Sequence, residues 1–182
     1  YYVQGFVNLY SEFRRADGHV LWMHDDQWEG QDFKRSPGNL YSEVQRVRLD
    51  AGAGYDIRLV ADQVIPPVEV PEDTEWVQRF RFESPMLTEF WGRPIYLGAT
   101  VRLPRDYHTS TIEYPVLYKQ GHFSLSDPLR GAAMDEWMED DFPRMIIVTF
   151  QHPTPYFDDS YAVNSANNGP YGDAILQELI PE

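Results

Sequence analysis

The sequence contains no cysteine, which excludes disulfide bonds and thiolate metal sites. Basic residues are also few, because 15 Lys and Arg face 29 Asp and Glu, for a formal net charge of −14. Nucleic acids and anionic membrane surfaces attract basic proteins, so we expect neither as a partner. No apolar run approaches the roughly 18 residues of a membrane-spanning helix, and we therefore expect no membrane span.

Residues that can form a hydrophobic core are abundant. Hydrophobic residues make up 42% of the 182 positions and aromatic residues 15%. That content is sufficient for one medium domain or two small ones, and it argues against a disordered chain.

The first 83 residues have the pattern of a β-rich, turn-rich module. Residues 2–13 alternate loosely, residues 16–19 (ADGH) form a hairpin turn, and an apolar strand resumes at Val20. Further short strands are predicted at 43–49 and 55–64 from their two-residue period. Three prolines between residues 64 and 71 favour an extended edge or linker. We predict a module over residues 1–83.

Aromatic residues gather in this module at Trp22, Trp28, Phe33 and Tyr41. Such a group can form a carbohydrate-binding platform on a sandwich. Aromatic side chains more often fill the core of a small sheet domain, and we expect that role here.

From residue 84 onward the pattern changes to apolar strands separated by helices. A strand over 75–82 leads into strands at 95–103, 114–119 and 145–150, with helices predicted at 127–138 and from Asp173 to the end. Near-continuous apolar strands are typical of a sheet covered on both faces. The fold class predicted for residues 84–182 is therefore α/β, and the class predicted for the whole chain is a β-rich module followed by an α/β sheet.

Two strands end in polar segments that are candidates for a site. Residues 120–123 (QGHF) follow one strand and residues 151–156 (QHPTPY) follow another. Ligands collect outside the carboxyl ends of strands in open α/β sheets, where backbone N–H groups can face a developing negative charge. We therefore take Gly121, His122 and Phe123 as candidates for an oxyanion loop, although His122 also fits an ordinary surface loop. Gln120, His152 and Tyr156 are candidate substrate contacts, and His152 fits a structural or pocket-lining role better than acid–base chemistry.

The segment 158–172 is a long polar and aromatic loop. Asn164 and Asn167 offer neutral donors and acceptors for a substrate, and loops of this length are often functional. The alternative is a capped entry to the last helix, with Asp173 at its positive end. Adjacent carboxylates at Asp158-Asp159, like the group His24-Asp25-Asp26, lack a spaced set of partner ligands. We expect solvated turns there and predict no metal and no cofactor.

The sequence contains no recognisable motif for a serine nucleophile. Ser124, Ser126 and Ser165 all lie outside a Gly-x-Ser-x-Gly elbow, the strand-to-helix turn that presents a catalytic serine. No catalytic residue is assigned within the chain.

Four segments carry a family resemblance. They are residues 92–107 (GRPIYLGATVRLPRDY), 114–123 (YPVLYKQGHF), 145–150 (MIIVTF) and 171–181 (YGDAILQELIP). In order and approximate spacing they resemble the N-terminal half of the putative esterase family of α/β-hydrolases, which includes enterochelin esterases and S-formylglutathione hydrolase. In that family the strand matching 115–119 leads into the oxyanion loop, usually His-Gly, where this chain has Gln120-Gly121.

The resemblance implies a serine carboxylic-ester hydrolase whose serine, acidic residue and histidine follow residue 182, in the order of this fold. Residues 84–182 would then be the first half of the catalytic domain, ending before the nucleophile elbow and inactive alone. The implied partners are a small-molecule ester and the C-terminal half of the same polypeptide, unless a second chain supplies that half after nicking. The first 83 residues resemble the small sandwich that precedes such domains in exported bacterial proteins, which implies a secreted or periplasmic location.

The alternative is a non-catalytic protein that binds a glycan or peptide on a degenerate hydrolase scaffold, since fold does not fix function. A Gly-x-Ser-x-Gly-like elbow soon after residue 182 would favour the enzyme, and its absence would favour the binding protein.

Overall fold

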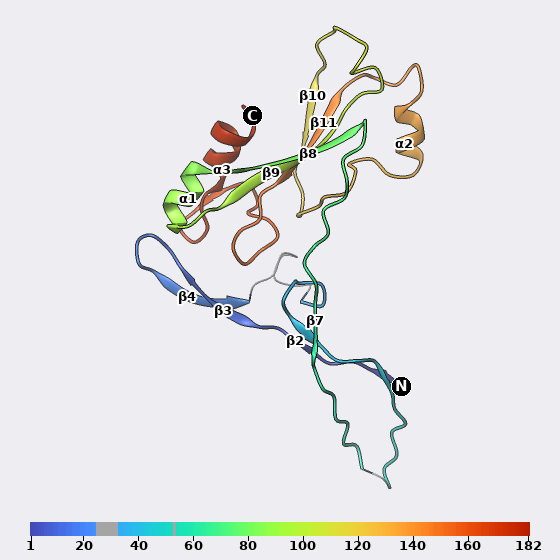
Figure 1. Ribbon diagram of the computed structural model, residues 1–182, viewed down its shortest axis with the longest axis vertical. Coiled ribbons are helices and arrows are strands. Elements are labelled where there is room, and N and C mark those ends of the chain that lie inside the picture. Colours follow the sequence, from blue (N-terminus) through green and yellow to red (C-terminus); the bar gives the residue numbers. More distant parts are fainter. Residues whose placement is uncertain (25–32, 53) are drawn as a thin grey trace.

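The computed structural model describes residues 1–24, 33–52 and 54–182. It is β-rich: strands outnumber helices, and the strands form several separate sheets. Figure 1 shows an elongated arrangement, with the largest sheet and the helices at one end and the N-terminal strands at the other. Among the described residues, no helix is long and apolar enough to cross a membrane.

The described residues of the N-terminal module form three small antiparallel sheets. Strand β1 pairs with β6, β3 pairs with β4, and β5 lies between β2 and β7. The strands are β1 (Tyr2–Val3), β2 (Phe6–Val7), β3 (Tyr10–Arg14), β4 (Val20–His24), β5 (Leu40–Tyr41), β6 (Gln45–Arg46) and β7 (Gln63–Val64). The hairpin predicted around residues 16–19 is confirmed as β3 and β4.

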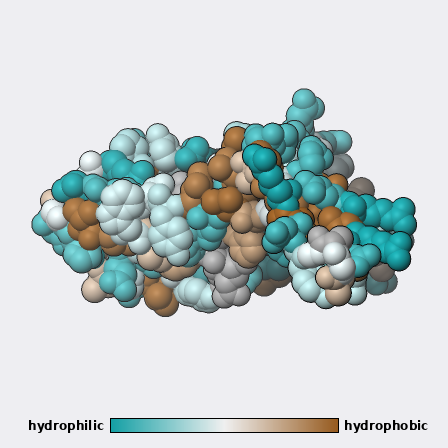
Figure 2. Space-filling view, turned by 90° about the horizontal axis from the view of Figure 1, so that it is seen from below, coloured by the Kyte–Doolittle hydropathy of each residue, from teal (hydrophilic) through white to brown (hydrophobic). Residues whose placement is uncertain are grey.

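Two of the predicted strands are much shorter than expected. The one predicted over 43–49 is reduced to β6, and the one over 55–64 to β7. An alternating sequence forms a long strand only where one of its faces packs against other parts of the protein. Here Ile57, which the pattern placed on a buried face, is exposed. The view from below in Figure 2 accordingly shows hydrophobic surface interleaved with hydrophilic surface on this side of the molecule.

The aromatic group expected to form a core here is divided. Phe33 and Tyr41 flank Phe6, with ring centroids 6.0 and 6.3 Å from it. Trp22 is 63% exposed, so its predicted core role is wrong. Trp28 lies outside the described residues, as do Asp25 and Asp26 of the acidic group near His24.

The main sheet has four strands in the order β10-β11-β9-β8. Strand β10 pairs with β11 in parallel, whereas β9 is antiparallel to both β11 and β8. Their bounds are β8 (Val77–Glu83), β9 (Tyr96–Arg102), β10 (Val116–Lys119) and β11 (Ile146–Gln151). All four correspond to predicted strands.

One property of β10 was predicted wrongly. Its apolar sequence indicated a buried strand, but all four of its residues are exposed, with Leu117 at 50%. The reason is its position, because β10 is an edge strand with β11 on one side and no further strand beside it among the described residues. An exposed edge of this kind is open to additional pairing.

Helices contact the sheet at two places. Helix α1 (Pro85–Trp91), α3 (Tyr171–Ala174) and the π-helical turn η1 (Ile175–Leu179) lie together, and α2 (Ala132–Trp137) lies apart from them (Figure 1). Two short strands, β12 (Asn164–Ser165) and β13 (Gly169–Pro170), form a small ladder just before α3. The helix predicted over 127–138 is thus confined to α2, whose buried residue is Trp137.

Helix α1 shows how local sequence sets its ends. Ser84 caps it by accepting a hydrogen bond from the Leu87 N–H, and Pro85 begins the first turn. Gly92 ends it at a φ of 66°, with its N–H donating to Thr88 O. Glu178 of η1 accepts hydrogen bonds from Ser84 Oγ and from the Met86 N–H at 2.9 Å, which ties the two helical elements together.

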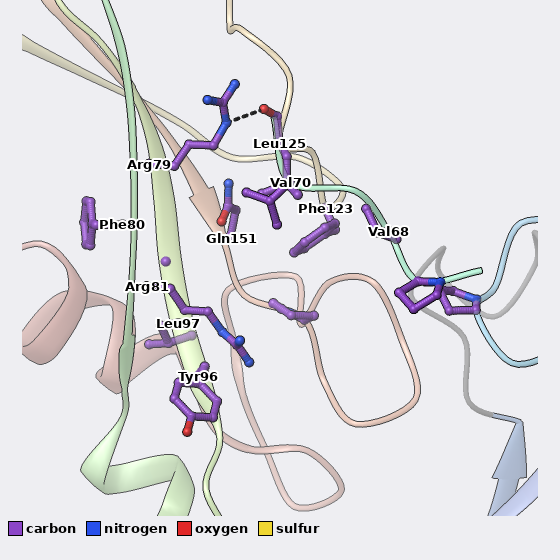
Figure 3. A pocket seen from close by; sticks show the side chains of 14 residues that line it. Val68, Val70, Arg79, Phe80, Arg81, Tyr96, Leu97, Phe123, Leu125 and Gln151 are labelled. Carbon is purple, nitrogen blue, oxygen red and sulfur yellow. Dashed lines mark hydrogen bonds between the residues drawn. The ribbon is translucent and has the colours of Figure 1, made fainter. Parts of the chain in front are cut away.

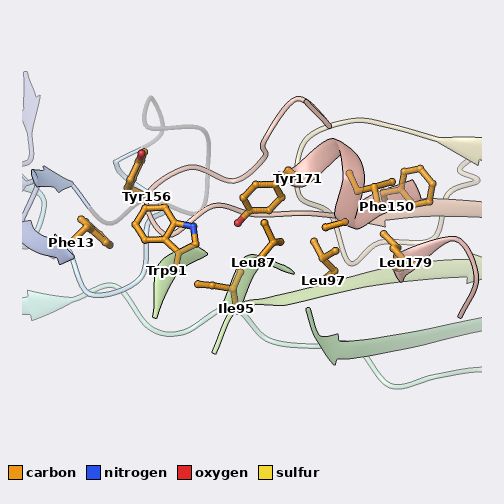
Figure 4. Packing of buried hydrophobic residues seen from close by; sticks show 12 residues of the cluster. Phe13, Leu87, Trp91, Ile95, Leu97, Phe150, Tyr156, Tyr171 and Leu179 are labelled. Atoms are coloured by element: carbon orange, nitrogen blue, oxygen red, sulfur yellow. The ribbon is translucent and has the colours of Figure 1, made fainter. Parts of the chain in front are cut away.

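The core forms between one sheet face and these helical elements. Figure 4 shows Leu97 and Phe150 of the sheet facing Leu87 of α1 and Tyr171 and Leu179 of the last helical segment. Phe13 of the hairpin belongs to the same cluster, with its ring 5.3 Å from that of Tyr156. The β3–β4 hairpin is therefore packed onto the main sheet's core.

Candidate functional site

The two segments predicted to converge follow neighbouring parallel strands. Lys119, the last residue of β10, pairs with Thr149 of β11, and β11 ends two residues later at Gln151. The loops that begin at Gln120 and His152 therefore leave the sheet at the same edge, as predicted. Carboxyl ends of parallel strands are where ligands gather in open α/β sheets.

The loop after β10 is fixed by three side chains from the sheet. Gln151 donates from Nε2 to Ser124 O at 3.2 Å, and Arg79 donates from Nε to Leu125 O at 2.8 Å. Arg102, which is buried, forms an ion pair of 2.7 Å with Asp127. Because backbone carbonyls and a carboxylate are held from three strands, the loop has a defined conformation without secondary structure of its own.

Gln151 reaches the loop because its neighbour on β9 is a glycine. Gln151 is opposite Gly98 in the ladder, and its amide also donates to Thr100 Oγ1 at 2.7 Å. A Cβ on Gly98 would stand 2.5 Å from Phe80 O and 3.1 Å from Gln151 Oε1. A side chain at this position would displace the β8 backbone and disturb the amide.

The candidate residues of the loop after β10, which are Gln120 and the predicted oxyanion-loop residues, divide between two hollows. Gln120, Gly121 and His122 line one of about 440 Å³ against the start of α2. Gly121 is exposed, and a Cβ there would meet nothing within 4 Å. Phe123 instead turns into a second hollow of about 400 Å³.

This second hollow has mainly apolar walls and lies beside the anchored loop. Figure 3 shows Val68 and Val70 of the proline-rich linker on one side, with Tyr96 of β9 opposite and Phe123 and Gln151 between them. The guanidinium of Arg81 lies 3.9 Å from the centre of the Tyr96 ring. The linker predicted over 64–71 thus forms one wall.

A histidine and two aspartates meet across the two loops. His122 Nδ1 lies 2.6 Å from Asp159 Oδ2 and 3.7 Å from Asp158 Oδ1. Asp158 and Asp159 are 2% and 5% exposed, whereas the His122 side chain is 57% exposed. The expectation of a solvated turn at Asp158-Asp159 is therefore wrong, because both residues are buried.

His152 is held at the base of the second loop. Its Nδ1 accepts hydrogen bonds from the Ser160 N–H at 3.1 Å and from Ser160 Oγ at 2.9 Å. The neutral ring consequently carries its proton on Nε2. Burial lowers the pKa of His152, against an opposing effect of the Asp159 charge that raises it. Ser160 and His152 form a serine–histidine pair, but at 3% and 1% exposure no substrate can reach it.

The backbone after this pair is strained. Tyr161 and Ala162 have φ values of 54° and 51°, in the left-handed region that non-glycine residues rarely adopt. Such conformations persist where the surroundings impose them, and they cluster at functional sites. The two residues directly follow the segment that buries Asp158, Asp159 and Ser160.

The other predicted contacts lie away from these hollows. Tyr156 is buried in the core cluster, and its hydroxyl donates to Asn168 Oδ1 at 2.7 Å. Asn164 Oδ1 accepts from the Asp173 N–H at 3.0 Å, which is the capped helix entry considered from the sequence. Asn167 is exposed on the loop between β12 and β13. Neither asparagine lines a hollow together with residues 120–123.

Comparison with known proteins leaves the family open. No family model matches the chain. No curated protein matches it either. The functional argument therefore depends on the geometry of the loops after β10 and β11.

Sequence reasoning missed the groups that fix these loops. Arg79, Arg102 and Asp127 gave no motif, because their partners lie far away in the sequence. Asp158 and Asp159 were noticed but lacked a partner. The available signal was the parallel pairing of β10 with β11, which brings the loop containing His122 over the loop containing both aspartates.

Proposed function

We propose that this chain is part of a serine carboxylic-ester hydrolase of the α/β-hydrolase fold, with the nucleophile located after residue 182. The observation that carries the proposal is the anchored loop at the carboxyl end of β10. In chain order β10 is the third strand of the main sheet, and α2 follows it. In α/β-hydrolases one oxyanion-hole N–H comes from the loop between the third strand and the next helix. The four-segment resemblance to the putative esterase family agrees with this placement.

In this proposal the backbone N–H groups near His122 and Phe123 donate to the oxyanion of the tetrahedral intermediate. Donors of this kind are effective when they are already fixed before charge develops. The contacts of Gln151, Arg79 and Arg102 hold Ser124, Leu125 and Asp127, which follow these two residues in the same loop. Loss of one oxyanion donor typically lowers kcat by about 10²–10³-fold.

The hollow between the linker and β9 is the proposed site for the acyl or alcohol portion of the ester. It adjoins Phe123, and its walls are mainly apolar with the Arg81 guanidinium at one side. Small-molecule sites commonly combine apolar walls with a few polar groups that fix orientation. Gln120 remains a proposed contact from the neighbouring hollow.

The experiment is hydrolysis of p-nitrophenyl acetate by the full-length protein, before and after treatment with a serine-directed phosphonate, with the modified residue identified by mass spectrometry. The proposal predicts turnover, loss of turnover on modification, and one labelled serine after residue 182. Ser160 serves as an internal control, because its burial predicts that it stays unlabelled.

Turnover with no labelled serine, or with the label on a serine of residues 1–182, would contradict the proposed mechanism. An intact protein with neither turnover nor label would favour the non-catalytic glycan- or peptide-binding alternative.

A further inference from the structure

The group formed by His122, Asp158 and Asp159 has the composition of a metal site. Each residue offers one ligand atom, and the three atoms lie within 4.8 Å of one another. The two carboxylates come from adjacent residues of one loop and the imidazole from the loop after β10. No other part of the described chain brings three such groups together.

The burial of the two carboxylates favours a bound cation. Burying a carboxylate is costly unless it is paired or coordinates a metal. Asp158 and Asp159 are both nearly inaccessible, and both lie within ion-pair distance of the same imidazole. A divalent ion at this point would contact both carboxylates and the imidazole.

A second observation lies beside the group. His152 Nε2 is buried and has no hydrogen-bond partner among the described residues. His152 is 1% exposed and is held through Ser160, the residue after Asp159. A buried N–H without a partner is costly. The loop that carries both carboxylates therefore also holds an unsatisfied polar group at its base.

We propose that His122, Asp158 and Asp159 bind a divalent transition-metal ion of the Zn²⁺ type. An imidazole with two carboxylates suits Zn²⁺ better than Mg²⁺ or Ca²⁺, which prefer oxygen ligands alone. Two ligands at about 2.0 Å from a tetrahedral ion are about 3.3 Å apart. The separation of 3.7 Å between His122 and Asp158 is near that value, and the 2.6 Å contact with Asp159 must lengthen to admit the ion.

Three protein ligands leave a fourth position for water or substrate, as in catalytic zinc sites. The site does not depend on the proposed esterase activity, because its ligands are side chains whereas the oxyanion donors are backbone N–H groups. It replaces the expectation from sequence that the chain binds no metal.

The test is isothermal titration calorimetry of the chelator-treated protein with ZnCl₂, and a second titration uses MgCl₂. We expect one saturable site per chain for Zn²⁺ and much weaker binding of Mg²⁺. His122→Ala should weaken Zn²⁺ binding by at least about 100-fold, since loss of even an outer-shell partner typically costs 10–100-fold. His19→Ala and Asp141→Asn, which change exposed residues elsewhere, should leave the affinity unchanged.

His122 is more than half exposed, so His122→Ala should fold, and near-UV circular dichroism checks this. A Zn²⁺-dependent rise in Tm for the wild type and for His19→Ala, absent in His122→Ala, gives a second readout that needs no activity. Equal Zn²⁺ affinity for wild type and His122→Ala would overturn the proposal. Tighter binding of Mg²⁺ than of Zn²⁺ would overturn the assigned class of ion.

Discussion

His122 Nδ1 lies 2.6 Å from Asp159 Oδ2, although the two residues follow different strands and are 37 positions apart. The contact exists because β10 and β11 are parallel neighbours, so that their following loops meet above the same edge of the sheet. It connects an imidazole that is 57% exposed to a carboxylate that is almost fully buried. The loops therefore form one structural unit.

The ion pair between Arg102 and Asp127 should stabilise that unit. Arg102→Met removes the partner of Asp127 and the contact with the Trp137 ring. Breaking a buried ion pair typically costs 3–5 kcal/mol, and we expect about 3 kcal/mol because Asp127 keeps partial access to water. The measurement is the free energy of unfolding in urea.

The control for this prediction is Arg14→Met, which removes an exposed ion pair with Glu12. Pairs of that kind contribute about 0–1 kcal/mol. Similar losses for the two variants would show that Arg102 does not anchor the loop after β10.

Substitution of two glycines by alanine should change the stability of the protein to different extents. Gly98→Ala places a Cβ 2.5 Å from a backbone oxygen of β8, so we expect a loss of about 1–3 kcal/mol from overpacking. Gly121→Ala meets open space and should change stability by no more than about 0.5 kcal/mol. Thermal and urea unfolding of both variants compare them directly. A destabilised Gly121→Ala would contradict the open space found beside Gly121 in the loop after β10.

The lowered pKa of His152 predicts how the stability of the protein depends on pH. Burial lowers the pKa of His152 below its usual 6.5 in the folded protein. The unfolded chain therefore binds the proton more readily, and protonation favours unfolding. Stability should rise as pH increases through the range just below 6.5 and then level off. Urea unfolding between pH 5 and pH 8 measures this dependence.

The matched variant is His152→Asn, which keeps an acceptor for the Ser160 N–H but does not titrate. Its stability should depend less on pH below 6.5 than that of the wild type. An unchanged dependence would mean that His152 is protonated as readily in the folded protein as in the unfolded chain.

The sequence predicted those parts of the structure that depend on local pattern. Strands β9 and β11 follow from their apolar runs, and the turn at residues 16–19 from its aspartate and glycine. Burial is different because it depends on distant neighbours. Leu117 belongs to an apolar strand yet is exposed at a sheet edge, whereas Asp158 belongs to a polar loop yet is buried. Neither position could be assigned without the strand order.

The candidate site was predictable in outline because its two loops follow strands that are recognisable from local pattern. Two strand ends with polar loops were identified, and their convergence required that the strands be parallel neighbours. The contact between His122 and Asp159 could not be predicted, because it depends on register and loop path. Tyr156 was chosen for its place after a strand, but its ring packs between Phe13 and Trp91.

The crystal structure of the full-length protein after phosphonate modification is the most direct test of the esterase account. The account predicts a phosphonyl oxygen about 2.7–3.1 Å from a backbone nitrogen of the loop at His122 or Phe123, with the modified serine located after residue 182. A phosphonyl oxygen that points away from this loop, with its hydrogen bonds supplied elsewhere, would contradict the assignment of the oxyanion hole.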